Sequence, residues 1–360
     1  MANTEVDPVG RWVVVDHFGA VTTLLAVGDQ EHAGVSPRRN LDRRAREVLL
    51  PALSEVIGSG AALRRIVHLG GDAYQVDARP VITPDRSHVT GAYGVFVSAA
   101  DPVPEPPLIG AWQWTVDTSG NNVGSTSSQW DADLYRLHEF TPDEVQSSRG
   151  PVGDWLTRLL PYEERARVKT TVDAGLAAAN GVHQLLTFGA VTRPDTPNPG
   201  RKQLALVGTS TVLPDRPGVF YAYGFTREVP KPSTYRTTGL DIVDAAEFAR
   251  AYFALAGDVA YAAVDCLQSS TFMTSPSWGR LGLHEPFEGD IASLALAEDR
   301  PAFEEFVAAA RRSVDHDAAT HDVRLVRDDG SPARFRVRAA RVDRTAAASR
   351  YLLLSFEARS

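Results

Sequence analysis

The sequence predicts an α+β protein with three tandem domains, at residues 1–100, 110–228 and 240–360, each a five-stranded antiparallel sheet with helices on one face. Two proline-rich stretches, 101–109 and 228–239, support this division, because closely spaced prolines can continue neither a helix nor a central strand. The same order of elements then recurs in each piece: two short strands, a helical middle that includes one longer helix, and three further strands. Each piece is close to the common domain size of about 100 to 150 residues.

The first piece is predicted from alternation and turn residues. Asn40 can cap a helix that starts near Leu41. The Gly70-Gly71 pair favours a hairpin, and in the strand after it Val76 and Ala78 alternate with polar residues, which is typical of a strand with one wet face.

The second piece has its longer helix near Glu163. Val168, Val172 and Leu176 lie on one stripe of that helix, and Asn180-Gly181 is a common helix stop. Three strands follow, separated by turns rich in proline and glycine.

The third piece repeats the order most clearly. Phe303 and Val307 lie at helical spacing after an acidic start near Glu298, where the helix dipole favours negative charge. Phe335 and Val337 then alternate with arginines, which predicts a strand. The three long helices start much further apart than the roughly 20 to 50 residues of a solenoid repeat, so we expect tandem domains.

Composition narrows the class of protein. The chain is 43% hydrophobic and 23% charged, as ordinary globular proteins are, and its formal net charge of −8 argues against a nucleic-acid binder. No run of about eighteen apolar residues predicts a membrane span. The N-terminus has no basic region followed by an apolar one, so we expect a cytoplasmic protein. The single cysteine, Cys266, excludes an internal disulfide.

The element order resembles that of the PAS sensor domain, in which helices are inserted between strands two and three of a five-stranded antiparallel sheet. The middle piece resembles the family most in Trp130–Phe140 and Pro161–Arg165, and the third piece in Trp278–Leu283, Glu298–Arg300 and the Asp329-Gly330 hairpin. The first piece rests on element order alone and equally resembles a GAF domain. The whole chain is similar to stand-alone proteins with three sensor domains from mycobacteria and related actinobacteria, which implies a sensing role but names no ligand or cofactor.

A set of aromatic residues in the second piece is the candidate ligand site. We expect them to line a pocket between sheet and helices that takes a small, largely apolar metabolite, although aromatic side chains also simply fill cores. The set consists of Trp112, Trp114, Trp130, Tyr135, Trp155 and Phe188.

A histidine and a cluster of arginines are two further candidate sites. His138 can be a pH-sensitive group or a haem ligand, but a histidine beside a glutamate is more often a hydrogen-bonded surface or boundary residue. A basic cluster near the first long helix can dock an acidic partner or can be a solvated helix face. It consists of Arg38, Arg39, Arg43, Arg44 and Arg46.

No catalytic or metal-binding set stands out, so the sequence predicts a non-catalytic signalling sensor or adaptor. Its middle or third domain would bind a small, largely apolar metabolite, and the protein would act through a separate output protein. Two alternatives stay open: a ligand-free scaffold for protein contacts, and an enzyme with an unrecognised site. A homodimer is also open, although the helix predicted at 241–257 lacks a sustained heptad and reads better as a spacer.

Overall fold

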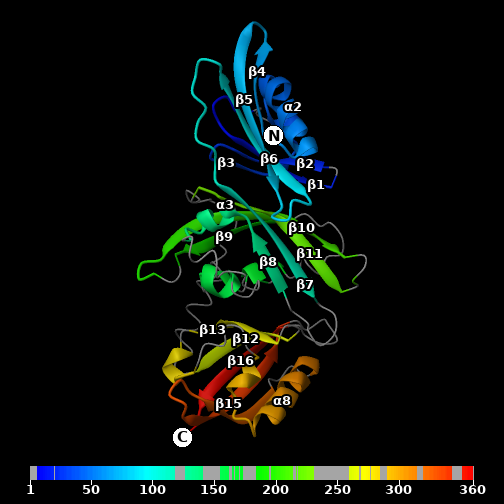
Figure 1. Ribbon diagram of the computed structural model, residues 1–360. Helices are drawn as coiled ribbons and strands as arrows, with labels where there is room; N and C mark the ends of the chain where they lie inside the picture. Colours follow the sequence, from blue (N-terminus) through cyan, green and yellow to red (C-terminus); the bar gives the residue numbers. More distant parts are fainter. Residues whose placement is uncertain are drawn as a thin grey trace, which may run out of the picture. The chain divides into compact units, whose positions relative to one another are not determined.

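The computed structural model shows three antiparallel sheets with few helices (Figure 1). The residues that it describes are 6–19, 21–117, 126–140, 155–161, 164–165, 167–169, 171–172, 184–193, 196–213, 216, 218–230, 259–266, 269–275, 277–283, 290–313, 319–342 and 351–359.

The chain packs into two compact units, and each is described by itself. The first unit consists of Met1–Val116, Ser127–Arg149 and Thr171–Tyr235, and the second of Asp117–Thr126, Gly150–Thr170 and Arg236–Ser360. The first unit thus holds two of the three sheets. The three predicted domain boundaries stay a prediction.

The first sheet has six strands, in the order β3-β2-β1-β6-β5-β4, where the sequence predicted five. The additional strand is β3, a polar edge strand whose pattern carries no clear alternation. The strands are β1 Val13–Phe18, β2 Val21–Val27, β3 Gln30–Val35, β4 Leu63–Leu69, β5 Asp72–Ile82 and β6 Val89–Ser98. The predicted hairpin between β4 and β5 is confirmed, because Gly70 and Gly71 both have positive φ, as a tight two-residue turn requires.

The helix of the first sheet is α2, Arg43–Ser59, which packs against β4, β5 and β6. It begins after Asp42, whose carboxylate accepts a hydrogen bond from the Ala45 N–H at 2.8 Å. The predicted cap at Asn40 is therefore wrong: Asn40 ends a short preceding helix, α1, Pro37–Asn40. The expected start near Leu41 is confirmed to within two residues.

The second sheet has five strands in the order β8-β7-β11-β10-β9. Its elements are β7 Ile109–Asp117, β8 Thr126–Trp130, α3 Ala132–Leu137, β9 Gln184–Thr192, β10 Gly200–Val212 and β11 Val219–Glu228. Of the helix predicted near Glu163, residues 164–165, 167–169 and 171–172 are helical, and the others lie outside the described residues. A single π-helical turn, η2, precedes it at Trp155–Leu159.

The third sheet has the order β13-β12-β16-β15-β14, which matches the second. Its elements are β12 Ala260–Asp265, β13 Ser270–Thr274, η3 Gly279–Leu281, η4 Ile291–Leu294, α8 Arg300–Arg312, β14 Ala319–Val326, β15 Pro332–Arg341 and β16 Tyr351–Ala358. The helix expected near Glu298 is confirmed as α8. At its start Asp299 accepts hydrogen bonds from the guanidinium of Arg324 on β14, at 2.7 and 2.8 Å, which lowers the pKa of Asp299 to about 2.

The first and second sheets share one hydrophobic cluster, so the first two predicted domains do not pack independently of each other. Val14 and Val81 of the first sheet lie in one cluster with Ile109, Val207 and Phe225 of the second. Ile109 is the last residue of the first proline-rich stretch, so that stretch ends inside a core.

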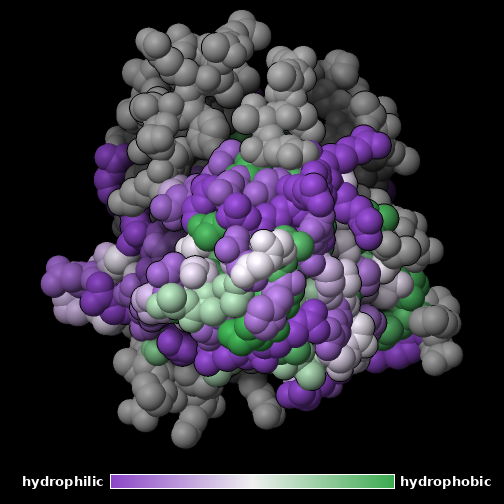
Figure 2. Space-filling view, turned by 90° about the horizontal axis from the view of Figure 1, so that it is seen from above, coloured by the Kyte–Doolittle hydropathy of each residue, from purple (hydrophilic) through white to green (hydrophobic). Residues whose placement is uncertain are grey.

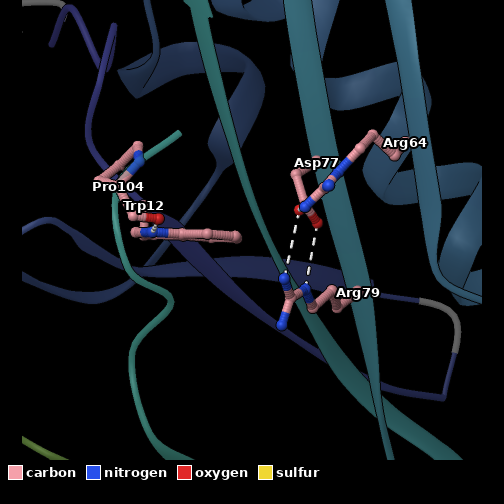
Figure 3. A network of polar contacts seen from close by, with 5 residues as sticks. All are labelled: Trp12, Arg64, Asp77, Arg79 and Pro104. Carbon is pink, nitrogen blue, oxygen red and sulfur yellow. Dashed lines mark hydrogen bonds and ion pairs between the residues drawn. The ribbon is translucent and has the colours of Figure 1, made fainter. Parts of the chain in front are cut away.

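A hydrogen bond joins the same proline-rich stretch to Trp12, which comes directly before β1 of the first sheet. The indole N–H of Trp12 donates to the Pro104 carbonyl at 3.3 Å (Figure 3). The Arg79 guanidinium lies 5.7 Å from the centre of the Trp12 ring and donates a hydrogen bond to the Asp77 carboxylate. A second arginine, Arg64, donates to the same carboxylate at 2.5 Å. Burial alone would raise the pKa of Asp77, but the hydrogen bonds from the two arginines outweigh it and lower that pKa.

The second proline-rich stretch, from residue 231 onward, and the helix predicted at 241–257 lie outside the described residues. Over the described part of the chain, no helix has the length and apolar character needed to cross a bilayer. Among the residues coloured by hydropathy in Figure 2, hydrophilic ones predominate, and apolar residues gather in smaller areas between them.

Candidate functional site

The structure pairs two of the predicted site residues in the second sheet. Trp112 and Trp114 both lie on β7 and stack with their ring centroids 4.4 Å apart. With residues of β10 and β11 they line a cavity of about 30 Å³, lined also by Val172, Gln184, Leu206, Gly208, Thr209, Ser210 and Ala222. That space suits a water molecule and is too small for a metabolite.

Two glycines lie directly against the ring of Trp112. Gly208 of β10 pairs with Gly224 of β11, and a Cβ at either position would come within 2.8 Å of the Trp112 ring. The indole therefore packs flat against backbone. Sequence reasoning missed these glycines, because a glycine inside a strand indicates a close approach without showing what approaches.

The other predicted residues lie elsewhere. Trp130 packs against Tyr135, with ring centroids 5.3 Å apart. Phe188 is fully buried on β9 but is not among the residues that line the tryptophan cavity. Trp155 is buried and belongs to the second compact unit. The structure thus groups the six residues into two pairs and two single positions, and binding by them stays a prediction.

His138 is buried rather than at the surface. It stacks on Trp130 with ring centroids 5.3 Å apart. Burial lowers the pKa of His138 to about 4, with Lys202 contributing in the same direction, so the ring is neutral at physiological pH. It therefore does not change its charge near neutrality, and the surface interpretation is wrong.

A hollow with mixed apolar and polar lining lies over the first sheet, and we name it the arginine groove. Its volume is about 610 Å³, and it is lined by Ser36 and by residues of α1, α2, β1 and β2. Its apolar residues are Val15, Pro37, Leu50, Pro51, Leu53 and Ile57, and its polar ones are Thr22, Ser36, Arg38, Arg46 and Ser54. Volumes of roughly 300 to 1,000 Å³ are typical of small-molecule sites.

One stripe of α2 forms a wall of the groove. Arg46, Leu50 and Ile57 recur at intervals of four and seven residues, which places them on one face of the helix. The other helix faces pack on β4 to β6 or carry exposed charges. The groove thus arises because a single long helix covers one half of a six-stranded sheet.

Positive charge gathers at one end of the groove. Arg46 donates to the main-chain carbonyl of Arg38 at 3.2 Å, which holds the two arginines together. On the same helix Asp42 accepts the capping hydrogen bond from Ala45, and Glu47 bonds Arg43 at 2.8 Å. Among the described residues that line the groove, none is acidic.

A smaller hollow of about 160 Å³ lies in the third sheet's unit, lined by residues that include Cys266, Asp290, Glu304, Arg311 and Arg312. Burial raises the pKa of Cys266 to about 11, so the sulfur is a thiol and a poor nucleophile. Charges of both signs line this hollow, which gives no net preference for an anion or a cation.

A buried ion pair lies in the second compact unit. Lys169 Nζ is 2.8 Å from Asp265 Oδ2, and both side chains are almost fully buried, at 2% and 0% exposure. The ammonium also lies 5.4 Å from the ring centre of Phe272 and 5.8 Å from that of Tyr351. Paired in this way, the two charges join a helical residue to β12 of the third sheet.

Metal ligands do not gather in the part of the chain that is described: no group of three or more His, Cys, Asp or Glu residues there can hold an ion.

Comparisons with known proteins show the fold. No protein-family model matches the chain, and no curated protein matches it. An uncharacterized protein from Mycobacterium tuberculosis is similar over 98% of this chain and 97% of its own, with 15% identity and a TM-score of 0.57. This likeness extends over all three sheets and, at that identity, concerns the fold alone.

Two shorter matches are a sensory box histidine kinase/response regulator from Burkholderia thailandensis and the N-terminal domain of a diguanylate cyclase with PAS/PAC sensor from Marinobacter aquaeolei. The first covers 30% of this chain and 83% of that chain at 16% identity, and the second covers 28% and 94% at 13% identity. Both have TM-scores of 0.25, which are too low to support an argument.

Proposed function

We propose that this chain is a non-catalytic signalling sensor or adaptor of the cytoplasm, built from three PAS-like domains, that binds a small molecule and acts through a separate output protein. The observation that carries the proposal is the arginine groove, a ligand-sized hollow of about 610 Å³ over the first sheet. The strand order supports the PAS-like assignment. When the strands of each sheet are numbered from 1 in chain order, the spatial order is 2-1-5-4-3 in the second and third sheets. The first sheet has the same order when its additional strand β3 is left out.

We place the sensing site in the first sheet and not at the tryptophans of the second. The cavity beside Trp112 is about twentyfold smaller than the groove, and its indoles already stack on each other and on glycine backbone. Such self-packed aromatic side chains are typical of a core.

A route from the groove to the second sheet runs through β1. Val15 lines the groove, and its neighbour Val14 faces the opposite side of the sheet, as successive strand residues do. There Val14 lies in the hydrophobic cluster shared with Phe225 of the second sheet. If β1 has two conformations, a ligand that binds one of them more tightly would also favour one packing of the two sheets. The size of the effect is set by the difference between the ligand's affinities for the two conformations.

A variant that fills the groove tests the proposal. Ser54 is an exposed residue on the groove wall, and Ser54→Trp would occupy the space, whereas Glu55→Trp on the neighbouring face of α2 would not. Native mass spectrometry of the purified proteins should show added mass on the wild type and on Glu55→Trp, and none on Ser54→Trp. Added mass that is equal on all three would refute a sensing site in the groove.

A ligand-free scaffold is the second candidate function, favoured by the tight packing around Trp112. In that case an output protein recovered by the wild type in a pull-down would be recovered equally by Ser54→Trp. No added mass would appear on any of the proteins.

A further inference from the structure

Strand β4, Leu63–Leu69, forms one edge of the first sheet, and no described strand pairs with its outer side (Figure 1). We propose that this edge pairs with the same edge of a second copy of the chain, antiparallel and centred on Ile66, so that two six-stranded sheets join. The inference goes beyond the proposed function and does not depend on the arginine groove.

The first argument is the direction of the backbone groups of β4. His68 lies opposite Ala73 of β5, and the Ala73 carbonyl accepts a hydrogen bond from the Ala99 N–H at 2.8 Å, on the β6 side. Ala73 therefore does not bond the backbone of His68, because both groups of a strand residue point to the same side. Since bonded and non-bonded pairs alternate, the N–H and C=O groups of Arg64, Ile66 and His68 point away from β5. Such outward groups can bond a further strand.

The second argument is that β4 complements itself. In an antiparallel pair with Ile66 on the two-fold axis, the outward groups of each copy meet those of the other, and all seven residues of the strand take part. No arginine lies opposite an arginine in this register, and apolar residues face each other at the centre and at both ends. The facing pairs are Ile66 with Ile66, Leu63 with Leu69, Arg64 with His68, and Arg65 with Val67.

The third argument is charge. Charged side chains on an edge strand usually oppose pairing with another chain. On β4, however, each arginine bonds a carboxylate of its own chain: Arg64 bonds Asp77 of β5 (Figure 3), and Arg65 bonds Glu55 of α2 at 2.8 Å. These carboxylates offset the two positive charges, so the edge can approach a copy of itself.

The fourth argument is the exposed apolar surface of the edge. Ile66 is 50% exposed, whereas Leu63, Val67 and Leu69 are partly buried against the core of the first sheet. Pairing would bring the two Ile66 side chains together, and β-branched residues directly opposite each other stabilise a pair of strands. The contact is one strand wide, and interfaces of small area associate weakly. We therefore expect a dimer that dissociates on dilution.

Sedimentation equilibrium of the full-length protein tests the proposal. Wild type should change from monomer to dimer between about 1 and 100 μM, the range expected for a small interface. Ile66→Lys places two ammonium groups opposite each other and should weaken the dimer at least about tenfold. Val21→Lys is the matched control, because Val21 is also an exposed aliphatic residue of the first sheet, at 62%, but lies on β2 and should leave association unchanged.

A charge-swapped pair of variants tests the register. Position 66 faces only itself, so neither Ile66→Glu nor Ile66→Lys should dimerise alone, whereas an equimolar mixture should form a heterodimer. Recovery of association in the mixture also shows that both variants are folded. Wild type that stays monomeric at about 100 μM, a concentration at which even small specific interfaces associate, would overturn the proposal. An Ile66→Lys protein that dimerises like wild type, or a mixture that stays monomeric, would overturn pairing centred on Ile66.

Discussion

Replacing Asp265 by asparagine should destabilise the unit that contains the third sheet more than any exposed ion-pair change. The replacement keeps the shape of the side chain but removes its charge, so the buried ammonium of Lys169, at 2% exposure, loses the carboxylate that lies 2.8 Å from it. Removing one partner of a buried pair costs about 3 to 5 kcal/mol, because the remaining ion has lost its hydration and its partner. The aromatic rings of Phe272 and Tyr351 compensate only in part.

Calorimetric unfolding of the full chain is the suitable assay, because two compact units need not unfold in one transition. A loss of this size lowers the midpoint of the affected transition by on the order of 10 °C. The matched control is Asp322→Asn, which breaks an exposed pair with Arg336 at 3.2 Å and should cost about 1 kcal/mol or less. The double variant Lys169→Met with Asp265→Leu removes both charges and should recover most of the loss.

The reasoning is refuted if Asp265→Asn lowers the midpoint no more than Asp322→Asn does. It also fails if the double variant is as unstable as the single one, since the cost would then lie in packing and not in the unpaired charge.

Three further changes test other parts of the fold. Gly208→Ala places a Cβ 2.6 Å from the Trp112 indole, so it should lower the unfolding free energy by about 1 to 3 kcal/mol and change the tryptophan emission. Its control is Gly58→Ala in α2, which has open space around it and should raise the unfolding free energy by about 0.5 to 1 kcal/mol. Because burial raises the pKa of Asp131 from 3.8 to about 6, its contribution to stability is complete below pH 3.8 and is lost as the pH rises through 6. Asp131→Asn should accordingly raise the unfolding temperature relative to wild type at pH 7.5 and not at pH 4, and equal differences at both values would contradict the burial argument. Trp12→Phe removes the hydrogen bond to the proline-rich stretch 101–109 and should speed its cleavage in limited proteolysis; an unchanged cleavage rate would show that the bond does not hold the stretch.

Local pattern predicts much of the fold. The hairpin at Gly70-Gly71 requires positive φ at both positions, and only glycine adopts it freely, so two residues suffice to predict it. The helix α8 was predictable because Phe303 and Val307 repeat at helical spacing on a strongly amphipathic segment. Strand β3 escaped prediction because an edge strand needs no buried face, and its sequence has no alternation.

The shared core and the groove depend on contacts that no local pattern contains. Ile109 looks like part of a linker, since prolines precede it, yet its side chain joins a cluster with residues of both sheets. The sequence showed a basic cluster beside the first helix. Which of its arginines face the groove depends on how α1 and α2 lie against the sheet, and the sequence pattern alone does not show this.

The pocket predicted from the aromatic residues of the second piece also depended on contacts that the sequence does not show. Large rings predict a pocket only if they leave space between them, and spacing along the chain does not show whether they do. Trp112 fills its own space by stacking on Trp114 and on glycine backbone, so the largest side chains of the second sheet enclose little volume. The larger hollow is lined instead by medium-sized residues such as Leu50 and Ile57.

Hydrogen exchange of the full chain, with and without the small molecule that it retains through purification, tests most directly the claim that the groove over the first sheet is the sensing site. The account predicts slower exchange in α2 and in strands β1 and β2, with strand β9 unchanged. Unchanged exchange in α2, or protection confined to the strands around Trp112, would contradict it.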